Sequence, residues 1–294
     1  MRARKAGSGE ARQRGRAVTT LAEHAPGTGR GGLLSAARVA ARVRRYLPAI
    51  LVFLATIVIW EIGTAGPGRH VLPPPSAIAG AFAEDGAVLR KSALATFYES
   101  LGGLALGTLL GVLVSLATSR WAAVRGVLLP VAIASSAIPI VAIAPILNNW
   151  FGVLNPLSKM GMAALLVFFP VMINVTRGLV EVPPAALELM RSYASSDREV
   201  LFKVRVPNML PFFFTALKVG TTLAFIGAIV GEFFGGTSDV LGRVVLQSLS
   251  SGRFPTAWAG IFLGAAGAIV SYLLVALAER LVIPWYGSLV GSQD

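Results

Sequence analysis

The sequence has 294 residues, of which 55% are hydrophobic and 14% are charged, and it contains no cysteine. With a mean hydropathy of +0.71, the chain has too few polar side chains to cover a water-soluble globule. The composition therefore predicts a membrane protein, and the lack of cysteine excludes disulfides, thiol redox chemistry and cysteine-ligated metals within this chain.

The first 45 residues are rich in arginine, glycine and alanine and lack a long apolar run. We expect a basic cytoplasmic arm at 1–45 that is no cleavable signal peptide and is largely disordered up to about Arg30. Residues Ala36–Arg45 form a candidate basic helix on the anionic inner leaflet. The alternative is a solvated arm that only helps to fix the orientation of the chain.

Six charge-poor stretches follow, each suited to a helix that crosses a bilayer, which takes roughly 20 apolar residues. They lie at Leu47–Ala65, Ala95–Thr118, Gly126–Leu147, Ser158–Leu179, Leu210–Phe234 and Ala257–Ile283. Their apolar runs are continuous, whereas the strands of a membrane barrel alternate. We therefore expect an all-α polytopic membrane bundle with six transmembrane helices at 46–289, and a short tail at 290–294.

The lysines and arginines indicate the orientation, because loops rich in these residues stay in the cytoplasm. A cytoplasmic N-terminus places nineteen of the 26 basic residues inside and six outside, with one, Lys218, inside the fifth helix. Both termini are thus predicted to be cytoplasmic. The net charge of +12 is then a signal of topology and of the basic arm, with no nucleic-acid partner implied.

The second stretch carries Gly103, Gly107 and Gly111, spaced four apart. Such a strip of small residues lets another helix approach closely. Packing within the chain is the favoured interpretation of this strip, and a seam between two copies is the alternative.

The third stretch contains Pro139 and Pro145, which should kink or break its helix and free backbone polar groups. Polar side chains on the same segment are candidates for a substrate pathway: Ser135, Ser136, Asn148 and Asn149. Ordinary hydrogen bonds between helices explain these four residues equally well, and both asparagines also fit at the outer interface.

The longest polar interruption, at 181–209, is predicted to lie in the cytoplasm. Pro183 and Pro184 suit the first turn of one helix, and Ser196 and Glu199 form an S-x-x-E capping box for a second helix that ends before Pro207. The two helices should meet in a bend at 194–196. Apolar stripes are expected on both of them: Leu187, Met190 and Tyr193 on the first, and Val200, Leu201 and Val204 on the second. A partner surface would explain so structured a loop.

Ionisable residues inside spans are costly and tend to mark pathways or pairs. For Lys218, a side chain that snorkels to the cytoplasmic interface is preferred over one that attracts an anion. Glu61, Glu99 and Glu232 fall toward external helix ends, where contact with headgroups or loops is the simplest role, although Glu232 is also a candidate for positioning an external gate.

Catalytic chemistry has no support in the sequence. Nothing places two of the acids together and no nucleophile motif accompanies them, so we expect no enzyme and no catalytic residue. His24 and His70 are too far apart in sequence to indicate a metal site, and the chain has no G-x-x-x-x-G-K-[ST] phosphate loop.

A spaced motif lies in the polar segment. Glu188-Leu-Met is followed after three residues by Ala194 and after nine more by Val204-Arg-Val-Pro207. With this motif the sequence resembles the inner-membrane permeases of binding-protein-dependent ABC importers, whose signature is E-A-A, three residues, G, nine residues and I-x-L-P. Ala194 replaces the signature glycine, and alanine is penalised at positive φ, so the bend should be tighter in helical space or slightly strained.

The resemblance extends from about Val71 to Leu289 and is closest to the nitrate, sulfonate and taurine branch, which includes permeases for pyrimidine precursors of thiamine. The matching segments, in order, are Leu72–Ser76, Trp150–Gly152 with Ser158 and Lys159, Phe168–Pro170 with Asn174, and Gly231–Gly235.

The resemblance implies a permease subunit of an ATP-driven importer in the cell membrane. Its partners would be a second permease copy in a homodimer, two ATPase subunits that bind ATP and Mg, an external solute-binding protein and the lipid bilayer, with no cofactor on this chain. The solute would be nitrate, a sulfonate, taurine or a pyrimidine precursor. The alternative is a self-sufficient secondary transporter or channel, which needs an ion relay for which Lys218 is the sole candidate.

Residues expected to couple the permease to the ATPase are Glu188, Leu189, Met190, Ala194, Ser195, Ser196, Val204 and Pro207. Residues expected along the solute pathway are Ser135, Ser136, Asn148, Asn149 and Glu232, and no metal ligands are expected.

Overall fold

A computed structural model describes residues 30–64, 66 and 71–285, and over these ranges the chain is helical, without strands. The all-α prediction is therefore confirmed. The chain divides into two compact units, residues 1–59 and 60–294, which are described separately.

The first unit contains most of α1 (Arg30–Thr64), which runs without interruption through residues 36–45. Its described side chains from Tyr46 onward are mostly exposed, and Ile59 reaches 71%. The hydroxyl of Thr56 donates to the carbonyl of Val52 at 2.9 Å, so its polar group is satisfied within the helix. An exposed apolar helix of this kind suits lipid. The predicted disordered part of the arm, residues 1–29, lies outside the described residues, as do 286–294.

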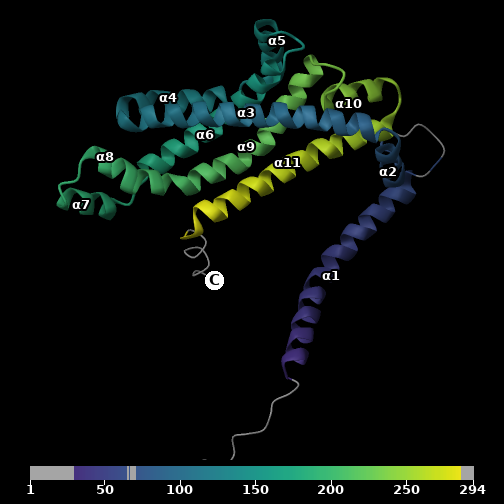
Figure 1. Ribbon diagram of the computed structural model, residues 1–294, viewed down its shortest axis with the longest axis horizontal. Coiled ribbons are helices and arrows are strands. Elements are labelled where there is room, and N and C mark those ends of the chain that lie inside the picture. The colour runs from purple at the N-terminus through teal and green to yellow at the C-terminus, as the bar shows by residue number, and fades with distance from the viewer. Residues whose placement is uncertain (1–29, 65, 67–70, 286–294) are drawn as a thin grey trace, which may run out of the picture. The chain divides into compact units, whose positions relative to one another are not determined.

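The core of the second unit is made by α3 (Gly86–Arg120), α6 (Pro156–Val180) and α9 (Val206–Phe234), with α11 (Phe254–Val282) packed against α9 (Figure 1). Leucine, valine and alanine side chains fill the space between the first three helices. A Cβ atom on Gly107 would lie 2.4 Å from the carbonyl oxygen of Ala164, and one on Gly103 or Gly111 would lie 2.3 or 2.9 Å from the nearest atom of α6. The glycine strip therefore serves packing within the chain, as predicted.

Short helices lie at both ends of this bundle. At one end are α7 (Pro184–Ser192) and α8 (Asp197–Val200), followed by a π-helical turn, η1 (Leu201–Arg205). At the opposite end are α2 (Pro75–Glu84) and α10 (Leu241–Ser250), as Figure 1 shows. A second apolar cluster at that end joins Ile78 of α2, Leu89 of α3 and Val244 of α10.

The break predicted for the third span is confirmed. The span consists of α4 (Ala122–Ser135) and α5 (Ile140–Phe151), which are bent by 98° where they meet. Pro139 caps α5 and marks the break, whereas Pro145 lies within α5 without ending it. The described residues contain five helices long and apolar enough to cross a membrane, or six if the bent pair forms one span.

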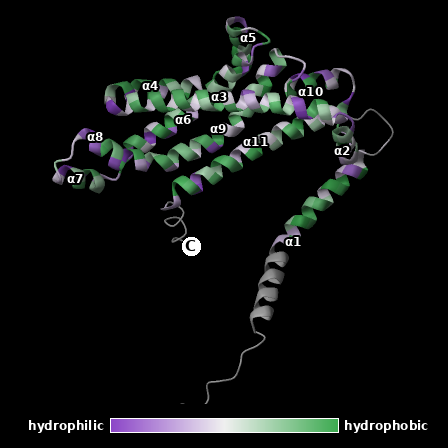
Figure 2. Cartoon of the chain, in the orientation of Figure 1, coloured by the Kyte–Doolittle hydropathy of each residue, from purple (hydrophilic) through white to green (hydrophobic). Residues whose placement is uncertain are grey.

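Hydrophobic residues predominate along the long helices of the second unit (Figure 2). Leu94, Leu109 and Leu273 are each more than half exposed, whereas Thr96, Lys159 and Glu232 are buried. This inverted distribution is typical of a protein whose solvent is lipid. The second unit thus agrees with the predicted membrane bundle.

Candidate functional site

Helix α7 begins where the sequence predicts. Pro183 is its N-cap and Pro184 occupies its first turn, where a missing N–H group costs no helical hydrogen bond. The helix has no buried residue. After α7 comes the tip of the polar segment 181–209, at residues 194–196, where the amide of Ser195 donates to the carbonyl of Met190 at 3.1 Å.

The tip bends at Ala194, whose φ of +50° is the one positive value among the described residues that are not glycine. Alanine pays a steric penalty in this left-handed region, so the strain predicted from the replaced glycine is confirmed. Ser196 then caps α8 in a complete capping box. Its amide donates to Glu199 Oε2 at 3.0 Å, and its Oγ accepts from the Glu199 amide at 3.4 Å.

The second helix continues past Pro207, so the predicted end before this proline is wrong. Helix α8, the turn η1 and α9 form one run of 38 residues from Asp197 to Phe234. Pro207 lies in the first turn of α9. The π-helical turn directly before it shifts the local hydrogen-bond pattern, and a proline that lacks an N–H group is tolerated at the point where the pattern changes.

The base of the segment is pinned by side chains that sequence analysis did not single out. Asn208 Nδ2 donates to the carbonyl of Gly178 at 2.7 Å and to that of Glu181 at 3.1 Å. Arg205 donates to the carbonyl of Leu179 at 3.3 Å. These bonds satisfy carbonyls at the end of α6. An asparagine directly after the proline of the motif was the available signal for this role.

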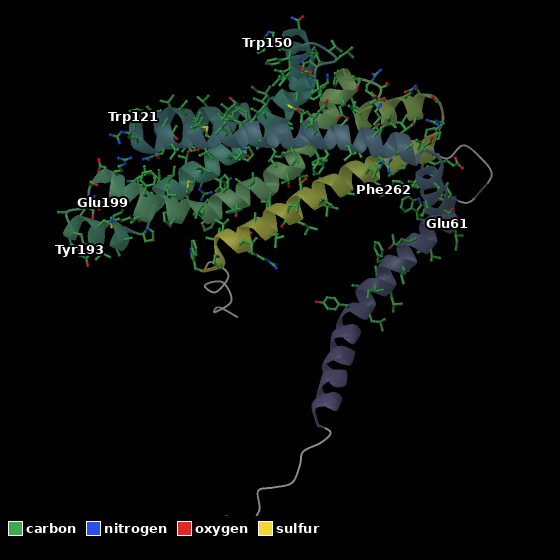
Figure 3. The ribbon with its side chains drawn as sticks, viewed as in Figure 1. Glu61, Trp121, Trp150, Tyr193, Glu199 and Phe262 are labelled. Carbon is green, nitrogen blue, oxygen red and sulfur yellow. The ribbon has the colours of Figure 1, made fainter. Side chains whose placement is uncertain are left out.

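The surface of the segment combines exposed acids, among them Glu188, with exposed apolar groups. Leu189, Tyr193 and Phe202 are 56%, 74% and 59% exposed. Tyr193, at the extremity of the segment in Figure 3, does not rest on the bundle, and its exposure agrees with the alternative of a partner surface. The other stripe residues are half-buried: Leu187, Met190, Val200, Leu201 and Val204. One side of the segment therefore packs against the rest of the chain, and the other side is exposed.

The predicted pathway residues do not form one group in this chain. Ser136 is exposed, its hydroxyl donates to the carbonyl of Ile133 at 2.6 Å, and Ser135 is half-buried. Asn149 is exposed, whereas Asn148 is buried and its side-chain oxygen has no hydrogen-bond partner. Glu232 is completely buried and does not face open space.

Sequence analysis missed a buried cluster of ionisable groups. Lys159, expected at the external end of the fourth span, is 1% exposed in the first turn of α6. Its ammonium donates to the carbonyls of Val153 and Asn155 and lies near the carboxyls of Glu99 and Glu232. The two acids lie close to each other, an arrangement that nothing in the sequence indicated. The available signal was a lysine in the first turn of an apolar span.

Lys218 does not snorkel alone to the interface as predicted. Its ammonium donates to Glu279 Oε2 on α11 at 2.8 Å, and the two side chains are 22% and 19% exposed. An ion pair of this kind lowers the cost of placing both charges inside an apolar bundle.

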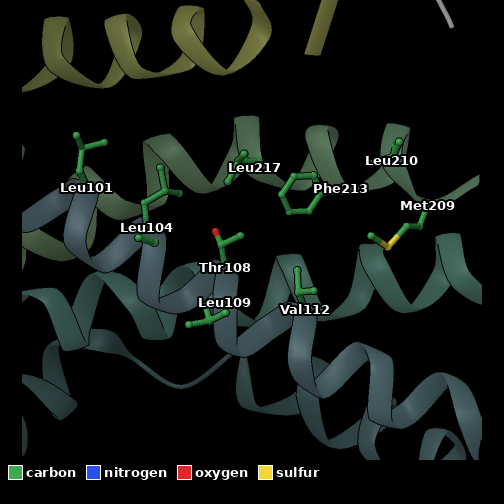
Figure 4. A pocket seen from close by; sticks show the side chains of 10 residues that line it. Leu101, Leu104, Thr108, Leu109, Val112, Met209, Leu210, Phe213 and Leu217 are labelled. Carbon is green, nitrogen blue, oxygen red and sulfur yellow. The ribbon is translucent and has the colours of Figure 1, made fainter. Parts of the chain in front are cut away.

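A groove of about 510 Å³ runs between α3 and α9 (Figure 4). Its lining is leucine, valine, alanine, methionine and phenylalanine, and Thr108 is its one polar side chain. A polar solute would lose its hydration there without gaining hydrogen bonds. The groove is therefore not a route for such a solute.

These features define a multi-pass helical membrane protein with a rigid, partly exposed segment at one end of its bundle. Residues 103–285, more than half of the chain, match the family described as binding-protein-dependent transport system inner membrane component. The chain belongs to this family. It is a permease subunit of the ABC importer class and a multi-pass inner-membrane protein.

Curated relatives cover most of the chain. A probable ABC transporter permease protein of Haemophilus influenzae is 35% identical over 69% of this chain and 83% of the relative. The formylaminopyrimidine transport permease protein ThiX of Halalkalibacterium halodurans is 33% identical over 80% and 94%. The putative aliphatic sulfonates transport permease protein SsuC of Bacillus subtilis is 27% identical over 83% and 88%.

Proposed function

We propose that this subunit works as a homodimer that forms the pathway for a small polar or anionic solute. Two separate ATPase subunits, which bind ATP and Mg, drive transport, and an external binding protein supplies the solute. The family description, which names a binding-protein-dependent system, supports the last partner. The orientation with both termini in the cytoplasm places the α7–α8 segment on the side where ATP is available.

The segment at α7 and α8 is the observation that carries the proposed coupling to the ATPase. It exposes Leu189, Tyr193 and Phe202 while its base is fixed by Asn208. Exposed aromatic and aliphatic side chains on a fixed helical frame suit insertion into a groove of a partner. Glu188 and the tip residues Ala194, Ser195 and Ser196 would lie in the same contact.

The solute is a nitrate-like anion, a sulfonate, taurine or a pyrimidine precursor. Relatives named for transport of formylaminopyrimidine and riboflavin are each 33% identical to this chain, and those named for taurine and nitrate are 28% and 24% identical. The higher identities favour a heteroaromatic solute. The test is uptake of a labelled formylaminopyrimidine into vesicles that contain the complete transporter. Unlabelled formylaminopyrimidine, taurine and nitrate serve as competitors.

Substitution of Ala194 by aspartate tests the coupling contact. A carboxylate at the tip would be desolvated in a groove without a partner, at a cost of a few kcal/mol. We expect Ala194→Asp to reduce co-purification of the ATPase subunit at matched expression. Thr237→Asp, on an exposed loop at the other end of the bundle, is the control and should not change it. Full recovery of the ATPase with Ala194→Asp would place the contact elsewhere.

A further inference from the structure

Helix α10 begins without a cap of its own. Its N-cap residue, Val240, has no side chain that can accept a hydrogen bond. The first amides of the helix are instead satisfied from two other helices. The Leu241 amide donates to Thr96 Oγ1 of α3 at 2.9 Å, and the Gly242 amide donates to Glu232 Oε2 of α9 at 2.5 Å. A carboxylate at this position also matches the positive end of the helix dipole.

Both acceptors are completely buried, and they contact each other. The exposed fraction of Thr96 and of Glu232 is 0%, and the side chain of Thr96 lies beside the carboxyl of Glu232. A Cβ atom on Gly242 would lie 2.7 Å from the Cβ of Glu232. The backbone at the start of α10 therefore contacts the side chain of Glu232 directly, and only glycine at position 242 leaves room for this contact.

Two further ionisable side chains lie beside the carboxyl of Glu232. The carboxyl of Glu99 on α3 lies against Glu232, and the ammonium of Lys159 on α6 supplies an opposite charge nearby. The carbonyls of Val153 and Asn155 fix Lys159 in turn. Buried charges are expensive, so a group of three that converges on one helix start calls for a specific purpose.

We propose that Glu232 is a positioning residue that fastens α10 to α3 and α9 at the end of the bundle opposite α7, and that the opposite charge of Lys159 stabilises its carboxylate. This proposal rests on the contacts of the described residues and not on the proposed transport function. It also assigns Glu232 a position inside the wall of the bundle, in place of the pathway role predicted from sequence.

Exposed ion pairs near α10 do not explain its attachment. Lys91 pairs with Asp239 at 2.8 Å, and this hydrogen bond holds the pKa of Asp239 below its ordinary range. Arg253 pairs with Asp85 at 3.3 Å. Exposed pairs of this kind contribute little to stability. Asp239 is therefore a matched control, because it is an acid two residues before α10 that makes no buried contact.

The test is amide hydrogen exchange of the purified full-length chain, resolved over peptides from α10 and α6. Removal of a hydrogen bond to a charged acceptor should raise exchange in α10 by roughly tenfold or more in Glu232→Ala. Exchange in the second half of α6, away from Lys159, should stay unchanged. Glu232→Gln keeps an acceptor oxygen and should restore most of the protection, and Asp239→Ala should behave as wild type.

Thr96→Val provides a second variant with nearly the same shape. It removes the acceptor of the Leu241 amide and should raise exchange at the start of α10 by a smaller factor, which keeps the test decisive if Glu232→Ala fails to fold. A uniform rise over all helices in these variants, wild-type exchange in α10, or an equal effect of Asp239→Ala would overturn the proposal. A positive result in a chain that fails to transport would leave it standing and reject only the proposed function.

Discussion

Replacement of Gly107 by alanine tests whether the contact between α3 and α6 sets the spacing of the core. The added Cβ would lie 2.4 Å from the carbonyl oxygen of Ala164 and 2.9 Å from the Cβ of Val167. An ordinary contact of this type begins at 3.4 Å, so the two helices would have to separate locally. The nearest of these atoms, the carbonyl oxygen of Ala164, belongs to the backbone, and it cannot rotate away as a side chain can.

Separation of α3 from α6 would strain the buried hydrogen bonds further along the same interface. Ser115 Oγ donates to the carbonyl of Met172 at 2.9 Å, and the hydroxyls of Thr118 and Thr176 are 3.2 Å apart. Overpacking in a dense core typically costs about 1–3 kcal/mol. We expect Gly107→Ala to lower the free energy of unfolding by that amount.

The assay is unfolding of the purified chain in detergent, followed by tryptophan fluorescence, with Gly126→Ala as the control. Gly126 lies on α4 with no atom within 4 Å of an added Cβ, and alanine has the higher helix propensity, so this control should be neutral or stabilising by up to about 1 kcal/mol. Equal stability of Gly107→Ala and Gly126→Ala would refute the argument that α3 and α6 are in backbone contact.

Three further predictions concern other parts of the chain. Ala194→Gly should relieve the positive φ, partly offset by the greater freedom of glycine in the unfolded chain, and raise the free energy of unfolding by no more than about 1 kcal/mol; a loss of stability would contradict the strain. Lys218→Met should lower the free energy of unfolding by about 1–3 kcal/mol, because it leaves the half-buried Glu279 unpaired. The double variant Lys218→Met with Glu279→Gln should recover most of this loss in the same unfolding assay, and additive losses would show that the two residues do not interact. Single cysteines at Ser196 and Thr237 should react with an impermeant thiol reagent from opposite sides of the membrane, the first from the cytoplasm; labelling from one side would reject the predicted topology.

Features set by neighbouring residues could be predicted from the sequence. The capping box of Ser196 and Glu199, the start of α7 at Pro184 and the break at Pro139 each depend on a few consecutive residues. The second helix was predicted too short because proline was expected to end it. The π-helical turn before Pro207 accommodates the proline, and the sequence pattern contains no signal for that turn.

Features set by contacts between helices could not be predicted in the same way. Glu99 and Glu232 are 133 positions apart, and the hydropathy pattern carries no information on which faces of their helices meet. Lys159 lies next to a predicted loop, so its burial depends on the fold of 153–155 around its ammonium. Tyr193 is a further case, because helical spacing placed it on an apolar stripe without deciding between the bundle and a partner, and the end of α7 at this residue leaves its ring exposed.

A single helical run reaches from the α7–α8 end of the bundle to the α10 end. The helical run from Asp197 to Phe234 has 38 residues, or about 57 Å at 1.5 Å per residue, which exceeds the roughly 30 Å of a hydrocarbon core. Its first turn is the capped α8, next to the tip at Ala194, and its last turns carry Glu232, which holds α10. Since helices of this kind move as packed rigid elements, a displacement of α8 by a partner would be carried along α9 to the contact with α10. We expect a Glu232→Ala variant that loosens α10 still to bind a partner at α7 and α8, whereas the change in amide exchange of α10 on partner binding should become smaller.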